Sequence, residues 1–468
     1  MAGAVSNMDR LGAGVLPVNL IEGVDQRSSI EERLAAYHCP GVAICVIEDG
    51  EIAEARGFGR IEQGGAAVAA DTIFAGASIS KALTAVLAMQ LVEQGAVELD
   101  EPINRHLQRW QIPENDFTRR VPVTLRHLLS HRAGTTVPGF GNYPLGRPAP
   151  SLVQILSGRP PSPTPPVEVD KLPGESVRYS GGGTQIVQLL LEDVVGTPFA
   201  TLAQERIFDP LGMRRSTFAV PLADVWKPLA AIGHDSQGAP LASRYSYTPQ
   251  LAAGGVYTTA PDYARFLIEC RNAWLGQPNA LMSRDTVCQM LESQDGGQFG
   301  LGWQVDGEGA AARFYHGGSN EGYQCNAMCL PEQGCGVVIM TNAVGGIMLH
   351  AELLTTVAEV YGWKGFNTRH RVRSLSTDEQ QAYVGQYDVT DGIARTTLEI
   401  WIENGQLHSF IHGLVFPPGP IYLADNGRFF SQRTRGEFVF AHDAAGIAQS
   451  LVVYAEGGVE LIRAERRA

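Results

Sequence analysis

The sequence predicts an α+β protein in which an antiparallel sheet is flanked by helices and interrupted by an all-helical subdomain. A small all-β barrel follows. Strand-like runs lie near both ends of the first 361 residues, whereas the sequence between them is mostly helical or loop. After about residue 375, short β-branched or aromatic runs alternate with regularly spaced turn signals, which is typical of a barrel or sandwich.

The N-terminal part of the sheet is predicted from a helix and a hairpin. Ser28-Ser29 caps an amphipathic helix that begins at Ile30. Residues 42–47 and 52–58 read as two strands, and Asp49-Gly50 between them is a strong hairpin turn. The following run, 78–94, has small and apolar residues at helical spacing and ends at a glycine.

The middle of the chain is expected to be helical, and strands return before residue 361. Residues 160–173 are too rich in proline for a helix or central strand, and they form either a surface loop or part of a rim over a pocket. The C-terminal elements of the sheet are predicted as strands at 313–316, 322–330 and 336–341, with a helix at 346–361. Strands at both ends predict one antiparallel sheet assembled from sequence-distant halves.

The last hundred residues are predicted to fold separately. Strand-like runs there are divided by turns at Asn404-Gly405, Asn426-Gly427, Gly446 and Gly457-Gly458. We therefore expect one large domain over 1–361, with its helical subdomain at roughly 82–260. A linker at 362–378 and a barrel domain at 379–468 complete the predicted organisation.

Composition excludes several functional classes. The net charge is −13 and basic residues do not cluster, which argues against nucleic acid or an anionic membrane as a partner. The N-terminus lacks a signal-like apolar run and no window is apolar enough for a membrane span, so a cytoplasmic location is expected. The seven cysteines are odd in number and scattered, which favours buried thiols over disulfides or a zinc site.

One lysine stands out, because only four of the 36 basic residues are lysines. It lies in Ser78-Ile79-Ser80-Lys81, where a serine precedes an amine by one helical turn. Burial can make a lysine amine neutral, whereas a guanidinium stays charged, so this pair can act as a nucleophile with its proton acceptor. Ser78 would open the helix, with unpaired N–H groups facing a substrate carbonyl. Alternatively, Ser78 is only an N-cap.

Two glycine-rich segments can complete such a site. In the segment 173–184, Tyr179 lies on a tight loop that can bring its phenol to the serine–lysine pair. There a neighbouring ammonium is expected to lower the pKa of the phenol and let it act as the base; otherwise the tyrosine packs on the surface. In Tyr315–Gly322, Gly317 and Gly318 follow a strand-borne His316, so the backbone can approach a substrate and the next amide can donate to an oxyanion.

The order Ser-x-x-Lys, Tyr-Ser-Gly, His-Gly-Gly resembles the serine β-lactamase/penicillin-binding-protein superfamily. The likeness is to its class C and D-aminopeptidase/esterase branch (peptidase family S12-like). Three further phrases match, and they lie at 124–131, 252–259 and 299–303. Together the motifs span roughly residues 30–361. The resemblance implies a β-lactamase-like fold, and the predicted barrel resembles the lipocalin-like domains that follow the catalytic domain in some of these peptidases.

The resemblance also implies roles for individual residues. Ser78 would be acylated, while Lys81 and Tyr179 would form the proton-transfer pair. The backbone N–H groups of Ser78 and Ser319 would form the oxyanion hole. His316 takes the place where many relatives carry a lysine.

Two departures from the family pattern bear on the substrate. Gly181 replaces a frequent asparagine that holds a substrate amide, and His316 replaces a lysine that binds a substrate carboxylate. Both weaken the case for β-lactams and favour a neutral or amine-bearing substrate. Gly181, Gly317, Gly318 and Asn320 are the expected substrate-binding residues.

The leading functional hypothesis is therefore an acyl-enzyme amidase or peptidase of D-aminopeptidase type that acts on a small molecule or short peptide. A carboxylesterase or transacylase, a true β-lactamase and a non-catalytic scaffold relative remain alternatives. His127 and His131, in a helix-like phrase, are expected to be structural. No cofactor or metal is implied, and whether the protein forms a homo-oligomer stays open.

Overall fold

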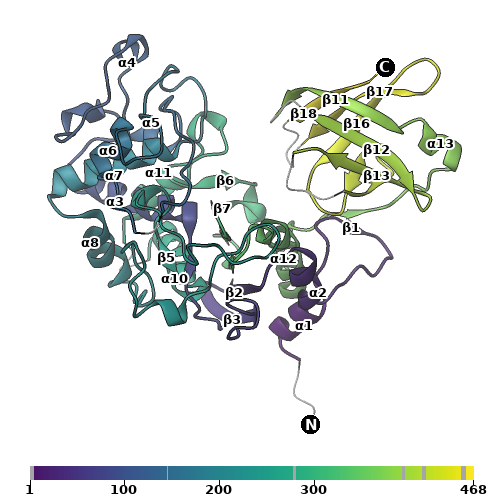
Figure 1. Cartoon of the computed structure of the whole chain (residues 1–468), viewed down its shortest axis with the longest axis horizontal. Coiled ribbons are helices and arrows are strands. Elements are labelled where there is room, and N and C mark those ends of the chain that lie inside the picture. The colour runs from purple at the N-terminus through teal and green to yellow at the C-terminus, as the bar shows by residue number, and fades with distance from the viewer. Residues whose placement is uncertain are drawn as a thin grey trace. The chain divides into compact units, whose positions relative to one another are not determined.

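The structure is a computed structural model that describes residues 5–144, 146–277, 281–392, 396–413, 418–454 and 460–467. The chain divides into two compact units. One comprises residues 34–347, and the other comprises residues 1–33 together with 348–468. Figure 1 shows the mixed helices and strands of the first unit and the yellow-green barrel of the second. The domain boundaries predicted from the sequence remain predictions.

A six-stranded antiparallel sheet forms the centre of the first unit. Its order is β3-β2-β9-β8-β7-β6. The strands are β2 (Gly41–Glu48), β3 (Glu51–Gly59), β6 (Gln304–Asp306), β7 (Arg313–Asn320), β8 (Tyr323–Leu330) and β9 (Cys335–Thr341). The predicted hairpin turn is confirmed: Asp49 and Gly50 both have positive φ, at 52° and 77°, as a two-residue turn of type I′ requires.

The predicted union of distant chain segments is also confirmed. β2 pairs with β9 in an antiparallel register that places Val42 opposite Thr341. Both strands are almost entirely buried, so their near-continuous apolar sequences have partners on both faces. The short strands β4 (Phe74–Ala75) and β5 (Tyr257–Thr258) form a separate pair. β4 ends shortly before Ser78.

Helices cover the sheet and fill the middle of this unit. α10 packs on β2, β3, β8 and β9, while α3, α7 and α9 pack together. The helices are α3 (Ser80–Glu93), α4 (Asp116–Arg120), α5 (Leu125–Leu129), α6 (Leu152–Ser157), α7 (Gly181–Val195), α8 (Phe199–Ala203), α9 (Leu251–Gly254), α10 (Ala260–Trp274) and α11 (Arg284–Leu291). α3 is buried on almost every side, because small residues alternate with large ones around it. It can therefore hold a polar side chain away from water.

The second unit contains a closed eight-stranded antiparallel barrel, as predicted. Its strands are β11 (Gly385–Gly392), β12 (Thr397–Glu403), β13 (Gln406–Ile411), β14 (Gly419–Leu423), β15 (Phe429–Ser431), β16 (Glu437–His442), β17 (Ala448–Tyr454) and β18 (Glu460–Arg466). Asn404-Gly405, Asn426-Gly427 and Gly446 lie in turns; Gly457-Gly458 falls outside the described residues. Alternate residues from the strands fill the interior with an apolar core that includes Tyr387, Phe429 and Phe438.

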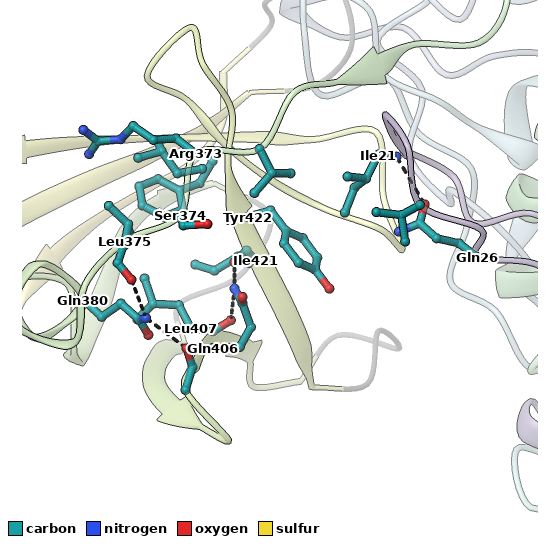
Figure 2. Close-up of a pocket in the computed structure, with 15 residues that line it drawn as sticks. Ile21, Gln26, Arg373, Ser374, Leu375, Gln380, Gln406, Leu407, Ile421 and Tyr422 are labelled. Carbon is teal, nitrogen blue, oxygen red and sulfur yellow. Dashed lines mark hydrogen bonds between the residues drawn. The ribbon is translucent and has the colours of Figure 1, made fainter.

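The remaining elements are α1 (Asn7–Ala13), β1 (Leu20–Ile21), α2 (Ile30–Ala36), α12 (Gly346–Tyr361), β10 (Arg369–His370) and α13 (Thr377–Gln381). β1 pairs in parallel with β10. This unit contains a pocket of about 360 Å³ (Figure 2). Its lining comes from an N-terminal segment, from residues 372–375, from Gln380 and Gly405, and from strands β13, β14 and β15; the N-terminal residues are Ile21, Val24 and Gln26. Gln380 donates through Nε2 to the carbonyl oxygens of Leu375 and Gly405. None of the residues that the sequence singled out for chemistry lines this pocket.

Within the described residues, no single helix is long and apolar enough to cross a membrane, although the bent pair Gly181–Val195 and Phe199–Phe208 reaches the required length and composition. No group of three or more His, Cys, Asp or Glu side chains in that part of the chain is arranged to hold a metal ion.

Candidate active site

Ser78 lies in a tight turn between β4 and α3. The turn, η1 (Ala77–Ile79), is a 3₁₀ helix, so α3 begins at Ser80 and not at Ser78 as the sequence suggested. Ser80 Oγ donates to the carbonyl of Ala77 and accepts from the N–H of Val256, at 2.7 and 3.0 Å. Ala77 has a left-handed φ of 50°, unusual for a residue with a side chain. The segment carrying Ser78 is therefore held in one conformation from both sides.

Lys81 lies beside Ser78 in a buried position. Its Nζ donates to Ser78 Oγ at 2.9 Å and to the carbonyl oxygen of Ala253 at 2.7 Å. The side chain is only 5% exposed, and this burial lowers the pKa of the amine to about 7. A substantial fraction of the lysine is therefore neutral at physiological pH, and a neutral amine can accept a proton.

Tyr179 precedes α7 and reaches the same point. Ser180 caps the helix by accepting from the N–H of Gly183 at 2.9 Å, which fixes the end of the tyrosine loop. The Ser78 side chain lies close enough to the Tyr179 phenol to act on its pKa, and Lys81 Nζ lies 4.9 Å from the centre of the tyrosine ring. Burial raises the pKa of Tyr179 to about 12. The expectation that this pKa would fall is wrong, because desolvation of the phenolate outweighs the effect of its neighbours.

His316 lies on β7 with its ring 6.4 Å from that of Tyr179, between ring centres. Its Nδ1 is 2.6 Å from the carbonyl oxygen of Gly317, which can only accept, so Nδ1 carries a proton and Nε2 is the free acceptor of the neutral ring. The side chain is 3% exposed, and burial, with a contribution from the Lys81 charge, lowers the pKa of His316 to about 4. The imidazole is therefore neutral at physiological pH.

The two glycines after His316 let β7 lie against the turn that carries Ser78. A Cβ added to Gly318 would be 2.2 Å from the carbonyl oxygen of Gly76 and 3.2 Å from the backbone nitrogen of Ser78. Cys325, opposite Gly318 on β8, donates from Sγ to the same Gly76 oxygen at 2.8 Å. This close backbone approach requires glycine, and Ser319, which follows directly, is exposed.

Two of the predicted substrate-binding residues make contacts within the protein. A Cβ on Gly181 would lie 3.0 Å from Cε2 of Phe140, so this ring occupies the space that a longer side chain would need. Asn320 donates through Nδ2 to Thr248 Oγ1 at 3.3 Å and to the carbonyl oxygen of Gly254 at 3.2 Å. The predicted roles of Gly181, Gly317, Gly318 and Asn320 in substrate binding stay predictions.

The structure adds aromatic neighbours that the sequence analysis did not place here. The ring of His131 lies 4.4 Å from that of Tyr179, and Phe299 lies 5.1 Å from His131, between ring centres. His131 and Phe299 lie in two of the segments that resemble the superfamily, 124–131 and 299–303. Their spacing in the sequence gives no indication that they contact Tyr179. His127, in contrast, accepts the N–H of Thr124 through Nδ1 and caps α5.

The chain is similar to several known proteins. The family described as Beta-lactamase matches residues 27–362. Penicillin-binding protein 4 of Amycolatopsis lactamdurans is 26% identical over 347 residues, which cover 69% of this chain and 87% of that protein.

Two of the solved structures that share the fold are as follows. The octameric penicillin-binding protein homologue from Pyrococcus abyssi superposes with a TM-score of 0.58 at 21% identity, covering 93% of this chain and 98% of that one. D-amino acid amidase from Ochrobactrum anthropi SV3 superposes with a TM-score of 0.57 at 21% identity, covering 70% and 95%.

Proposed function

The chain belongs to the β-lactamase family of serine hydrolases, and from that premise we propose that it cleaves small amides or short peptides through an acyl-enzyme on Ser78. The observation that carries the proposal is the 2.9 Å hydrogen bond from Lys81 Nζ to Ser78 Oγ. It joins a hydroxyl to an amine whose pKa burial lowers to about 7. A base that loses its proton near neutral pH is suited to activate a serine.

In the proposed mechanism, Ser78 Oγ attacks the carbonyl carbon while the neutral amine of Lys81 accepts the hydroxyl proton. The charge that develops on the carbonyl oxygen is stabilised by the N–H groups of Ser78 and Ser319. Tyr179 remains a phenol, because its pKa is raised to about 12. It passes a proton to the leaving nitrogen and regains one from the Lys81 ammonium. The C–N bond breaks, the amine departs, and water then releases the acid by the same steps.

His316 supports a preference for substrates without a carboxylate at this position. A neutral imidazole offers no charge to a carboxylate, but its Nε2 can accept a hydrogen bond from an amide or amine N–H. Penicillin and peptide C-termini present a carboxylate, so they are the less favoured substrates. A D-amino acid amidase among the structures of this fold agrees with an amide substrate.

Active-site labelling tests the nucleophile. We expect a fluorophosphonate to label one residue, and Ser78→Ala to lose the label. Ser176→Ala, which removes an exposed serine near the tyrosine loop, is the matched control and keeps the label. Labelling of the Ser78→Ala variant at the wild-type rate would contradict the assignment.

A substrate panel tests the reaction. D- and L-aminoacyl anilides, nitrophenyl esters of increasing chain length and a chromogenic cephalosporin compare amidase, esterase and β-lactamase activity directly. We expect the aminoacyl anilides to be hydrolysed and the cephalosporin to be poor. If only the esters turn over, the amidase proposal is withdrawn in favour of a carboxylesterase.

A further inference from the structure

The loop that carries Tyr179 is attached to His131 on both sides of the tyrosine. The N–H of Arg178 donates to the backbone carbonyl of His131 at 2.7 Å. The N–H of Ser180 donates to Nδ1 of the His131 ring at 3.2 Å. The residues before and after Tyr179 are therefore both bonded to one histidine.

The ring of His131 also packs on the tyrosine itself. The two ring centres are 4.4 Å apart with an angle of 40° between the planes, and Phe299 meets His131 edge-on at 5.1 Å. His131 is 5% exposed. Since Nδ1 accepts from Ser180, the proton of the neutral ring lies on Nε2. Burial and the nearby Lys81 and His316 hold the pKa of His131 well below its usual range. The ring therefore stays neutral, and Nδ1 remains able to accept the N–H of Ser180.

The backbone of His131 adds a second sign of constraint. Its φ is 56°, in the left-handed region that side chains disfavour. Such conformations persist where the surrounding contacts determine them, and they occur often at functional sites. Here the unusual conformation presents both the carbonyl and Nδ1 of one residue to the same loop.

We propose that His131 is a positioning residue that fixes the Tyr179 phenol beside Ser78 by holding the N–H groups on either side of it. The inference rests on the proposed function, because it assigns Tyr179 a part in catalysis. His131 acts only through the tyrosine, so it is not itself a proton donor or acceptor in the reaction. The Arg178 guanidinium, bonded to the Gly134 carbonyl and Asp170, also holds this loop, and so does Ser180 Oγ, which donates to the Thr136 carbonyl. The two bonds to His131, however, are made by the N–H groups directly next to Tyr179.

Two substitutions separate the acceptor from the rest of the side chain. Asparagine and glycine both tolerate a left-handed backbone, but only asparagine can place an oxygen where Nδ1 lies. We expect His131→Gly to lower kcat about 100-fold with little change in KM, since a displaced catalytic group costs about that much. His131→Asn should recover most of this loss, to within about tenfold of the wild type. Should His131→Gly fail to fold, His131→Ala, which also lacks an acceptor and whose small side chain this protein already accepts at a left-handed φ in Ala77, carries the same expectation.

A double-mutant cycle with Tyr179→Phe distinguishes positioning from general destabilisation. If His131 works through the phenol, its removal in the Tyr179→Phe background costs less than about threefold in kcat. His127→Ala removes a comparable Nδ1 acceptor that bonds the N–H of Thr124, and it should lower the melting temperature while leaving kcat within about twofold.

The outcomes are separable. Equal losses of kcat on removing His131 in both backgrounds, or no rescue by asparagine, would overturn the positioning role. If the wild type is not labelled at Ser78, the proposed function and this inference fall together. If it is labelled but the His131 variants match the wild type, only the inference falls.

Discussion

The pH dependence of acylation is the most direct test of the role proposed for Lys81. Its pKa is lowered to about 7, and the active form of a base is the one without its proton. At pH 6 about one eleventh of the lysine is neutral and at pH 8 about ten elevenths, so the acylation rate should rise about tenfold between these values. Above pH 8 it should reach a plateau, because the pKa of Tyr179 is raised to about 12.

The two histidines near Lys81 do not titrate between pH 6 and 8. The pKa of His316 is lowered to about 4, and that of His131 also lies well below its usual range, so neither imidazole changes charge between pH 6 and 8. The assay is the stopped-flow burst of nitrophenolate from an activated ester at constant ionic strength. Lys81→Arg, which keeps the charge at every pH, should abolish the burst. A rate that is flat or falls from pH 6 to 8, or a midpoint near 10, would refute the reasoning.

Three further predictions concern packing. Gly318→Ala should lower kcat at least about 100-fold, measured with the same ester, because its Cβ would lie 2.2 Å from the Gly76 carbonyl and push β7 away from the turn. Gly181→Asn should lower the free energy of unfolding by about 1–3 kcal/mol, and adding Phe140→Ala should restore part of it, as urea melts would show. Arg466→Met should cost about 2 kcal/mol or more in the barrel transition of a calorimetric scan, since the guanidinium binds three backbone carbonyl oxygens and a phenol.

Local chemistry made several elements predictable from the sequence. Asp49-Gly50 specifies its own turn, because both positions need a positive φ and this pair tolerates it. Apolar runs at both ends of residues 41–341 predicted a shared sheet, since each needs partners on two faces. The start of α3 was misplaced because the turn before it is set by hydrogen bonds to Val256, far away in the sequence.

The proximity of the candidate site residues was predictable from the sequence, but their electrostatics were not. The motif order indicated Ser78, Lys81 and Tyr179, and the structure brings these three side chains together. The direction of the tyrosine pKa shift depends on burial, which no spacing of residues reveals. The contact of His131 with Tyr179 joins segments 48 positions apart, so it follows from tertiary packing alone.

The topology of the central sheet has a consequence for synthesis of the chain. β2 leaves the ribosome early, but its partner β9 ends only at Thr341, and the groups around Ser78 come from three separate stretches. Pairings across so many residues form late and slowly. A chain that ends before β9 lacks the strand that joins β2 to β8, so we expect hydrolytic capacity only once β9, the last part of this central sheet to be made, has been synthesised.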